Sequence, residues 1–223
     1  MYGITSWIER KPGLKVNMAK TKITKPNKLK YLGFGFYYEL NTKTWKLRAH
    51  EESIKKFKER LKRLTIRKYS IRKDVRIRKL NPVIRGWINY FALCNMKTHM
   101  TNIDAHLRTR LRVIIRKQWT VPKKRQWGLQ KLGIGKDLGR QTSYMGNHYQ
   151  WIAIKICEVR AISKEKLTQK GLVSCLDYYT KQHTLKLIEH RVQNRMHGGV
   201  RGQLVLPYSI GKKMYVFITD IVS

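Results

Sequence analysis

The sequence predicts a mainly α-helical protein, in which a small antiparallel β element precedes a helical bundle and a β-hairpin follows it. Apolar residues recur at helical spacing between about residues 50 and 120. Short aromatic runs occupy the first fifty residues, and two β-prone runs lie near the C-terminus. The 223 residues are enough for one or two domains with a buried core.

The predicted β element lies in the first fifty residues. Residues 30–38, KYLGFGFYY, form an aromatic extended run, and residues 44–48, TWKLR, form a second one. The turn-like pair Asn41-Thr42 separates them, so the two runs are expected to pair as an antiparallel hairpin.

Helical spacing begins at His50. One side of the first helix carries apolar residues while the other positions are mostly charged; these apolar residues are Ile54, Phe57, Leu61 and Leu64. The basic segment 67–79 that follows is either a charged loop or an irregular basic helix.

The dipeptide Asn81-Pro82 predicts the start of a second helix, with asparagine as N-cap and proline at the first helical position. Its apolar face contains Val83, Ile84, Trp87, Ile88 and Phe91. Gly86 is expected to allow a close contact between helices.

A third helix is predicted from about Met100 to Trp119, with Arg108, Arg112 and Arg116 spaced i, i+4 on its outer face. Like charges at this spacing repel, and a bound phosphate backbone would reverse the sign of that effect. A solvated face is the competing interpretation. Because acidic partners are scarce, RNA contact is favoured.

Val121-Pro122 is expected to end the third helix. Lys123, Lys124 and Arg125 follow, flanked by Trp119 and Trp127. Aromatic rings among cations can stack on unpaired bases while the cations hold phosphates. For Trp119, a place in the core is an equally good interpretation.

The remaining segments are predicted from their glycine content and apolar runs. Residues 128–146 are expected to form a loop, and residues 149–160 and 171–179 short helices that cap the bundle. In the tail, residues 204–210 and 214–221 are expected to pair as a hairpin.

The charge of the chain indicates a polyanionic partner. Lys and Arg number 49 against 13 Asp and Glu, which gives a net charge of +36. Nucleic acid and anionic membrane both fit. No run of about 18 apolar residues is present, so a membrane-spanning helix is excluded, and no secretory signal is seen. The three separated cysteines suit buried, reduced thiols and an intracellular location, either cytoplasmic or organellar.

No arrangement of residues predicts catalysis, a metal site or a cofactor. The carboxylates are few: Glu51 and Glu52 belong to a helix start, and Asp104 and Asp177 stand alone. The histidines lack metal-ligand spacing, and no nucleophile motif is present. Catalytic residues are therefore predicted to be absent.

Residues 80–94, LNPVIRGWINYFALC, together with the arginine-rich helix up to Trp119, resemble the maturase-specific region (domain X, or thumb) of group II intron reverse transcriptases. The residues that carry the resemblance are Leu80, Pro82, Gly86, Trp87, Tyr90, Phe91 and Trp119. LKVNMAKTKI (14–23) and KYLGFGFYY resemble the last palm segments of the same enzymes, and the likeness extends to about residue 183.

The resemblance implies four regions. Residues 1–49 would be the remnant of a palm domain, 50–120 a helical thumb, 121–183 a basic helical extension, and 184–223 a tail unlike the family. The catalytic aspartates of the family, in a YADD motif, would lie before Met1. Reverse transcription is therefore not expected of this chain alone, and would need an N-terminal reverse transcriptase fragment as partner.

In the family, this region grips the intron RNA and stabilises its active fold, so that the RNA itself splices. The implied partner is group II intron RNA, with a DNA target as a further candidate. A generic basic RNA- or DNA-binding structural protein is the alternative. The main expected RNA contacts are Arg85, Arg108, Arg112, Arg116, Lys117, Lys123, Lys124 and Arg125. A second expected group is Lys55, Lys58, Lys62, Arg63, Arg67 and Lys68.

Overall fold

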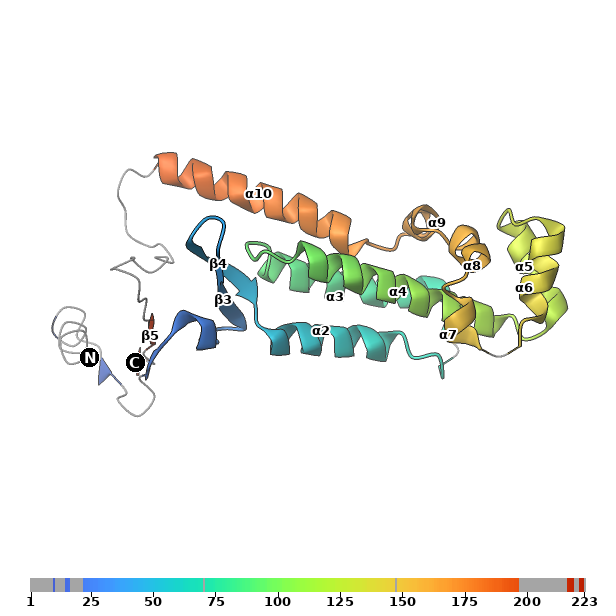
Figure 1. The fold of residues 1–223 in the computed structure, drawn as a ribbon, viewed down its shortest axis with the longest axis horizontal. Coiled ribbons are helices and arrows are strands. Elements are labelled where there is room, and N and C mark those ends of the chain that lie inside the picture. Colours follow the sequence, from blue (N-terminus) through green and yellow to red (C-terminus); the bar gives the residue numbers. More distant parts are fainter. Residues whose placement is uncertain are drawn as a thin grey trace. The chain divides into compact units, whose positions relative to one another are not determined.

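A computed structural model describes residues 10, 15–16, 22–69, 71–146, 148–196, 216–218 and 221–222. The chain divides into two compact units (Figure 1). Unit 1 contains residues 1–50 and 191–223, and unit 2 contains residues 51–190. The protein is mainly helical, with an antiparallel two-stranded sheet before the helices, as predicted.

Unit 1 contains the predicted N-terminal hairpin. Strand β3 (Phe34–Glu39) pairs antiparallel with β4 (Thr44–Ala49), and Phe36 lies opposite Leu47. Tyr38 and Trp45 are also cross-strand partners, with ring centroids 5.4 Å apart in an edge-on arrangement. Aromatic pairs of this kind stabilise a register.

Short strands also pair the N-terminal and C-terminal segments. Strand β1 (Lys15–Val16) pairs with β6 (Ile221–Val222). Strand β2 (Lys22–Thr24), followed by the 3₁₀ turn η1 (Pro26–Lys28), pairs with β5 (Val216–Ile218). The first strand of the predicted C-terminal hairpin, 204–210, lies outside the described residues. The described residues of its second strand pair with the N-terminal segment: Val216–Ile218 with β2, and Ile221 with β1.

Unit 2 opens with α2 (Glu51–Leu64), whose buried residues Ile54, Phe57 and Leu61 confirm the predicted apolar face. The next helix, α3 (Lys73–Tyr90), begins eight residues before Asn81, so the predicted start at Asn81 is wrong. Pro82 lies inside α3, and Lys73 to Lys79 are helical.

The Asn81 side chain does not cap α3 but links it to the α9–α10 connection. Its amide donates a hydrogen bond of 2.7 Å to the Gly171 carbonyl oxygen and accepts one of 3.1 Å from the Val173 N–H. Because these hydrogen bonds satisfy the Asn81 side chain inside α3, the residue does not need to cap a helix start. The Asn-Pro pair therefore gave a false signal of a helix start.

The long helix α4 (Lys97–Gln118) confirms the third predicted helix. The fully buried residues of α3 and α4 form the core of unit 2: Leu80, Ile84, Ile88, Met100 and Leu107. At the start of α10 (Cys175–Met196), the Tyr179 hydroxyl donates a hydrogen bond to the Cys94 carbonyl oxygen and accepts one from the Met96 N–H.

Five short helices follow α4, and the predicted loop over 128–146 is wrong. They are α5 (Pro122–Lys131), α6 (Lys136–Tyr144), α7 (Tyr149–Ile152), α8 (Ile156–Ala161) and α9 (Lys164–Gln169). A β-carbon at Gly128 would lie 2.7 Å from the Trp119 ring. Gly128 therefore lies within helix α5 and allows the Trp119 ring to pack directly against that helix.

Candidate nucleic-acid interface

Arg116 does not lie on the outer face of α4. Both Arg116 and Glu158 have 0% side-chain exposure, and they form an ion pair of 2.6 Å between Nη1 and Oε1. The Arg116 Nη2 also donates to the carbonyl oxygens of Thr142 and Met145 at the end of α6. The predicted outward position of Arg116 is wrong, because α4 packs against α6 and α8 at this level.

Two further predicted contacts are also buried. Arg112 donates from Nε to the Ile162 carbonyl oxygen at 3.0 Å, just after α8. Arg125 donates to the carbonyl oxygens of Trp119 and Thr120, at the end of α4. Helix ends leave carbonyl oxygens without intrahelical partners, and these guanidinium groups satisfy them.

Arg108, the remaining member of the predicted stripe, is partly exposed, and its Nη1 lies 2.9 Å from the Asp104 carboxylate. Asp104 also accepts bonds from the Ser174 hydroxyl and the Cys175 N–H. The three arginines therefore do not form one solvent-facing stripe.

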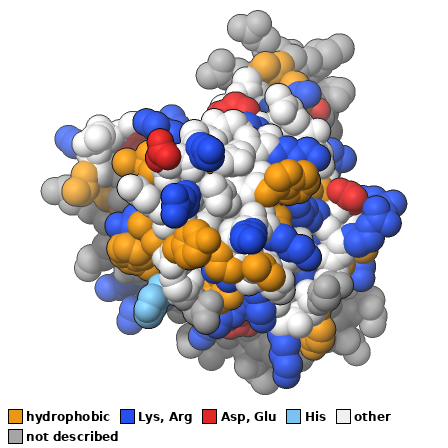
Figure 2. Space-filling model, turned by 90° about the vertical axis from the view of Figure 1, so that its right-hand side faces the viewer, with side chains coloured by type: hydrophobic (Ala, Val, Ile, Leu, Met, Phe, Trp, Pro, Cys, Tyr) orange, Lys and Arg blue, Asp and Glu red, His pale blue; other side chains and the backbone are white. Residues whose placement is uncertain are grey.

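The end of unit 2 that carries α5 to α8 has a mixed basic and apolar surface. Lys123 and Lys124 are exposed in the first turn of α5, and Trp127 follows on the same helix with 63% exposure. Figure 2 shows this end, where hydrophobic side chains lie among Lys and Arg and acidic side chains are sparse. Such a surface suits nucleic acid.

A groove of about 390 Å³ runs between α2 and α4. The exposed Lys55, Lys58 and Lys62 line its α2 side, as the sequence predicted for a basic face, and His106 and Arg110 line its α4 side. Burial, together with repulsion from Arg110, Lys58 and Lys62, lowers the pKa of His106. Burial and the neighbouring cations therefore both favour the neutral form of the His106 imidazole.

Arg63 and Arg67 are exposed and continue this basic surface past the end of α2, where they line an adjacent hollow of about 510 Å³. Arg110, on α4, holds the end of α2 at this hollow. It donates from Nε to the Thr65 hydroxyl at 2.6 Å and from Nη2 to the Lys62 and Thr65 carbonyl oxygens.

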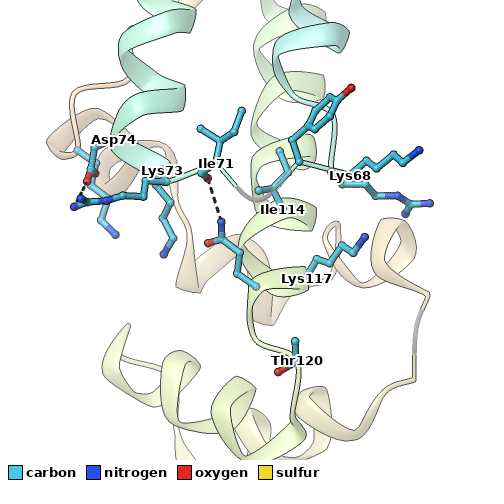
Figure 3. A pocket seen from close by; sticks show the side chains of 12 residues that line it. Lys68, Ile71, Lys73, Asp74, Ile114, Lys117 and Thr120 are labelled. Carbon is cyan, nitrogen blue, oxygen red and sulfur yellow. Dashed lines mark hydrogen bonds and ion pairs between the residues drawn. The ribbon is translucent and has the colours of Figure 1, made fainter.

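A cationic cavity of about 820 Å³ lies where the α2–α3 connection and the start of α3 meet the end of α4. Figure 3 shows Lys73 and Asp74 at the start of α3 on one side, Ile114 and Lys117 on α4, and Thr120 just after the end of α4. Its cationic residues are Arg67, Lys68, Arg72, Lys73, Lys117 and Lys170.

The electrostatics of this cavity favour an anion. Asp74 is the acidic residue among its described lining residues, and it lies 3.8 Å from Arg72. Burial and repulsion from Lys170 lower the pKa of Lys73, while Asp74 opposes that shift. A phosphate in this cavity would relieve the repulsion between the lysines.

Arg85 is exposed on α3, and its guanidinium carbon lies 5.9 Å from the centroid of the Tyr178 ring. Among the other motif residues, Leu80 and Phe91 are buried, whereas Trp87 is half-buried and stacks on Phe57 at 4.4 Å. Pro82, Gly86 and Tyr90 are exposed. A β-carbon at Gly86 would meet no atom within 4 Å, so the predicted close helix contact is wrong.

Several interface residues escaped the sequence prediction. Arg72, Lys73 and Lys170 come together only when the α2–α3 connection, the start of α3 and the end of α9 meet. His106 and Arg110 line the groove between α2 and α4, and neither was among the predicted contacts. The only signal for Arg110 was its place in the run RTRLR.

The described part of the chain shows no group of three or more His, Cys, Asp or Glu side chains that could hold a metal ion. Cys94, Cys157 and Cys175 are free and buried, as predicted, and burial raises the pKa of Cys94 to about 12. Within the described residues, no helix is long and apolar enough to cross a membrane.

A family model matches the part of the chain that contains the groove between α2 and α4. Residues 54–133 match the family model of the group II intron, maturase-specific domain, and the match contains most of α2 and all of α3, α4 and α5. This confirms the resemblance drawn from residues 80–119. No curated protein gives a significant match to the chain.

Proposed function

We propose that this chain binds group II intron RNA and assists the folding and splicing of that RNA, without catalysing a reaction itself. The observation that carries the proposal is the position of the cations. The exposed residues Lys55, Lys58, Lys62 and Lys117 all lie within residues 54–133, which match a maturase-specific domain.

The physical basis is charge neutralisation by a rigid scaffold. A compact RNA brings its own phosphates close together, and fixed cations offset the repulsion between them. The groove between α2 and α4 and the cationic cavity both present ammonium and guanidinium groups on packed helices. Intron RNA with bound protein would thus reach its active fold more readily, and the RNA would perform splicing.

Three predicted contacts are not part of the proposed interface. Arg112, Arg116 and Arg125 are buried and donate to acceptors inside unit 2. The predicted contacts that remain in the proposed interface are Lys55, Lys58, Lys62, Arg63, Arg67, Lys68, Arg85, Arg108, Lys117, Lys123 and Lys124.

The test is a salt titration of binding between the full chain and a group II intron RNA. The logarithm of the affinity should fall by roughly 0.7–0.9 per tenfold increase in salt for each phosphate neutralised. Changing Lys55, Lys58 and Lys62 to Gln should reduce this slope by roughly 2. The matched control changes Lys136, Lys181 and Lys186, which are exposed and outside residues 54–133, to Gln.

Two results would overturn the proposal. One is an affinity that does not change with salt. The other is equal competition by the intron RNA and bulk tRNA, which would reduce the interface to a generic polyanion surface. In the same titration, double-stranded DNA as competitor tests the DNA target as a further partner.

The palm-like segment leads to a finer proposal. Residues 14–23 and 30–38 resemble the end of a reverse transcriptase palm, which supports a partnership with an N-terminal reverse transcriptase fragment. Primer extension on an RNA template should then appear only when such a fragment is added to this chain. If the mixture extends no primer, the partnership is wrong, and the RNA-binding proposal is unaffected.

A further inference from the structure

A second cavity, of about 380 Å³, lies where the end of α4 meets α5, α8 and α9. Its floor is apolar and buried, with Ile115, Ile162 and Leu167 each less than a tenth exposed. Two indole rings, Trp119 and Trp127, also line it. Its volume lies in the range of small-molecule pockets, about 300–1,000 Å³.

The two indoles differ in how firmly they are held. Trp119 is half-buried and lies directly against Gly128, where a β-carbon would come within 2.7 Å of its ring. Trp127 is 63% exposed, and the Lys131 ammonium lies 4.9 Å from its ring centroid. One indole therefore forms a fixed wall, and the other offers a large open ring surface.

The charged residues at this cavity are all cationic among the described lining residues: Lys73, Lys131, Lys166 and Lys170. Lys166 donates to the carbonyl oxygens of Leu132 and Ala161, so it serves as part of the wall. Lys73 and Lys170 also line the larger cationic cavity. An RNA strand whose phosphates occupy the larger cavity would therefore pass the mouth of the smaller one.

We propose that this smaller cavity receives one unpaired nucleobase of the bound RNA. The inference rests on the proposed function and specifies the form of RNA recognised. The base stacks on Trp127 above the apolar floor, while Lys73, Lys131 and Lys170 hold the flanking phosphates. Stacking on an indole is tolerant of base identity, so the site selects an unpaired nucleotide and not a sequence.

The experiment compares three RNA hairpins that differ at one position: a bulged adenosine, an abasic bulge and a fully paired stem. For the wild-type chain, the bulged hairpin should bind on the order of 10- to 100-fold more tightly than the abasic one, the amount expected from stacking one base. Trp127→Ala should remove this difference, and Trp127→Phe should retain most of it.

Trp151→Ala is the matched control. Trp151 is 51% exposed on α7 and has the Lys155 ammonium 3.8 Å from its ring centroid, but it does not line the cavity. Its loss should leave the preference for the bulged hairpin unchanged. Gly128→Ala provides a second approach, because the added methyl group must displace the Trp119 ring. It should lower the preference while the circular dichroism spectrum stays helical.

Equal affinity of the wild-type chain for the bulged and abasic hairpins would overturn the inference. So would equal effects of Trp127→Ala and Trp151→Ala. Neither result would affect the proposed function, because the salt-dependent binding of intron RNA is tested separately with the α2 lysine variants. A Trp127→Ala chain that keeps the full preference would also overturn the inference. The exposed apolar surface at the cavity would then suit a protein partner instead of a nucleobase.

Discussion

Arg116 and Glu158 place a pair of charges where neither side chain reaches water. Burial raises the pKa of Glu158, while the hydrogen bond and charge of Arg116 oppose the shift. The Glu158 Oε2 and the Arg116 Nε have no hydrogen-bond partner among the described residues. The pair therefore joins α4 to α8 through a single strong contact, supported by the α6 carbonyl oxygens.

Removing one member of this pair should destabilise the fold strongly. Arg116→Met leaves the Glu158 carboxylate buried without its partner, and such a change typically lowers the free energy of unfolding by about 3–5 kcal/mol. The double variant Arg116→Met/Glu158→Leu should lose less than the single variant, because no unpaired charge remains. Urea denaturation of the full chain measures both. Additive losses would contradict this account.

The arginine positions show what sequence analysis could and could not predict at the residue scale. The spacing of Arg108, Arg112 and Arg116 correctly indicated one face of one helix, but a single helix gives no information about what packs on that face. Arg112 donates to the Ile162 carbonyl oxygen, and Arg116 donates to the Thr142 carbonyl oxygen as well as to the Glu158 carboxylate. Backbone acceptors have no signature in a sequence.

At the scale of elements, the groove between α2 and α4 should make RNA binding depend on pH. The pKa of His106 is lowered in the free protein, and a nearby phosphate would stabilise its protonated form. The pKa is then higher in the complex than in the free chain, so binding takes up a proton. Affinity should therefore rise as the pH falls from about 7.5 to 5.5.

The variant that tests this pH dependence is His106→Gln, which should bind RNA with a nearly constant affinity over the same range. His99→Gln is the control, because His99 is exposed on the same helix and does not line the groove. If the His106→Gln chain keeps the pH dependence of the wild type, the phosphate does not lie near this imidazole.

The connection between α9 and α10 depends on one asparagine in α3. Asn81→Ala removes the hydrogen bonds to Gly171 and Val173, and it should lower the free energy of unfolding by about 1–2 kcal/mol. Asn102→Ala, at an exposed position of α4, should change it by less than about 0.5 kcal/mol. Equal losses in a thermal melt of the two variants would refute the linking role of Asn81.

Elements with a regular apolar pattern were predicted well. The spacing of Ile54, Phe57 and Leu61 identified α2, and the aromatic runs around residues 34–49 identified the β3–β4 hairpin. The errors arose at residue types, such as asparagine, proline and glycine, that occur both at helix ends or in loops and inside helices. Asn81-Pro82 resembles a cap but lies inside α3. The glycine-bearing stretch 128–146 resembles a loop but contains α6 and the end of α5, and Gly128 gives room for the Trp119 ring.

At the scale of the whole molecule, the net charge of +36 works against the folded state through self-repulsion. Salt screens that repulsion, so the melting temperature of the free chain should rise as salt increases from low to moderate concentration. The complex with RNA should show the opposite trend, because salt weakens the phosphate contacts. Differential scanning fluorimetry with and without intron RNA compares the two trends, and parallel trends would contradict the explanation.

The distribution of charge also limits how far composition alone predicts an interface. Among the described basic residues, Arg76 donates to the carbonyl oxygens of Leu64, Ile66 and Tyr69, and Arg110, Arg112, Arg116 and Arg125 also satisfy backbone oxygens. Part of the positive charge therefore belongs to the scaffold. The number of RNA phosphates that the protein neutralises should therefore be smaller than its net charge of +36.

The ion pair between Arg116 and Glu158 also affects how the protein is made. The two residues are 42 positions apart, so Arg116 emerges from the ribosome before Glu158 does. At typical synthesis rates of about 5–20 residues per second, Arg116 waits roughly 2–8 seconds with an unpaired guanidinium. During that interval the nascent chain offers an extra cation to any RNA nearby, and the arrival of α8 withdraws it into the interior.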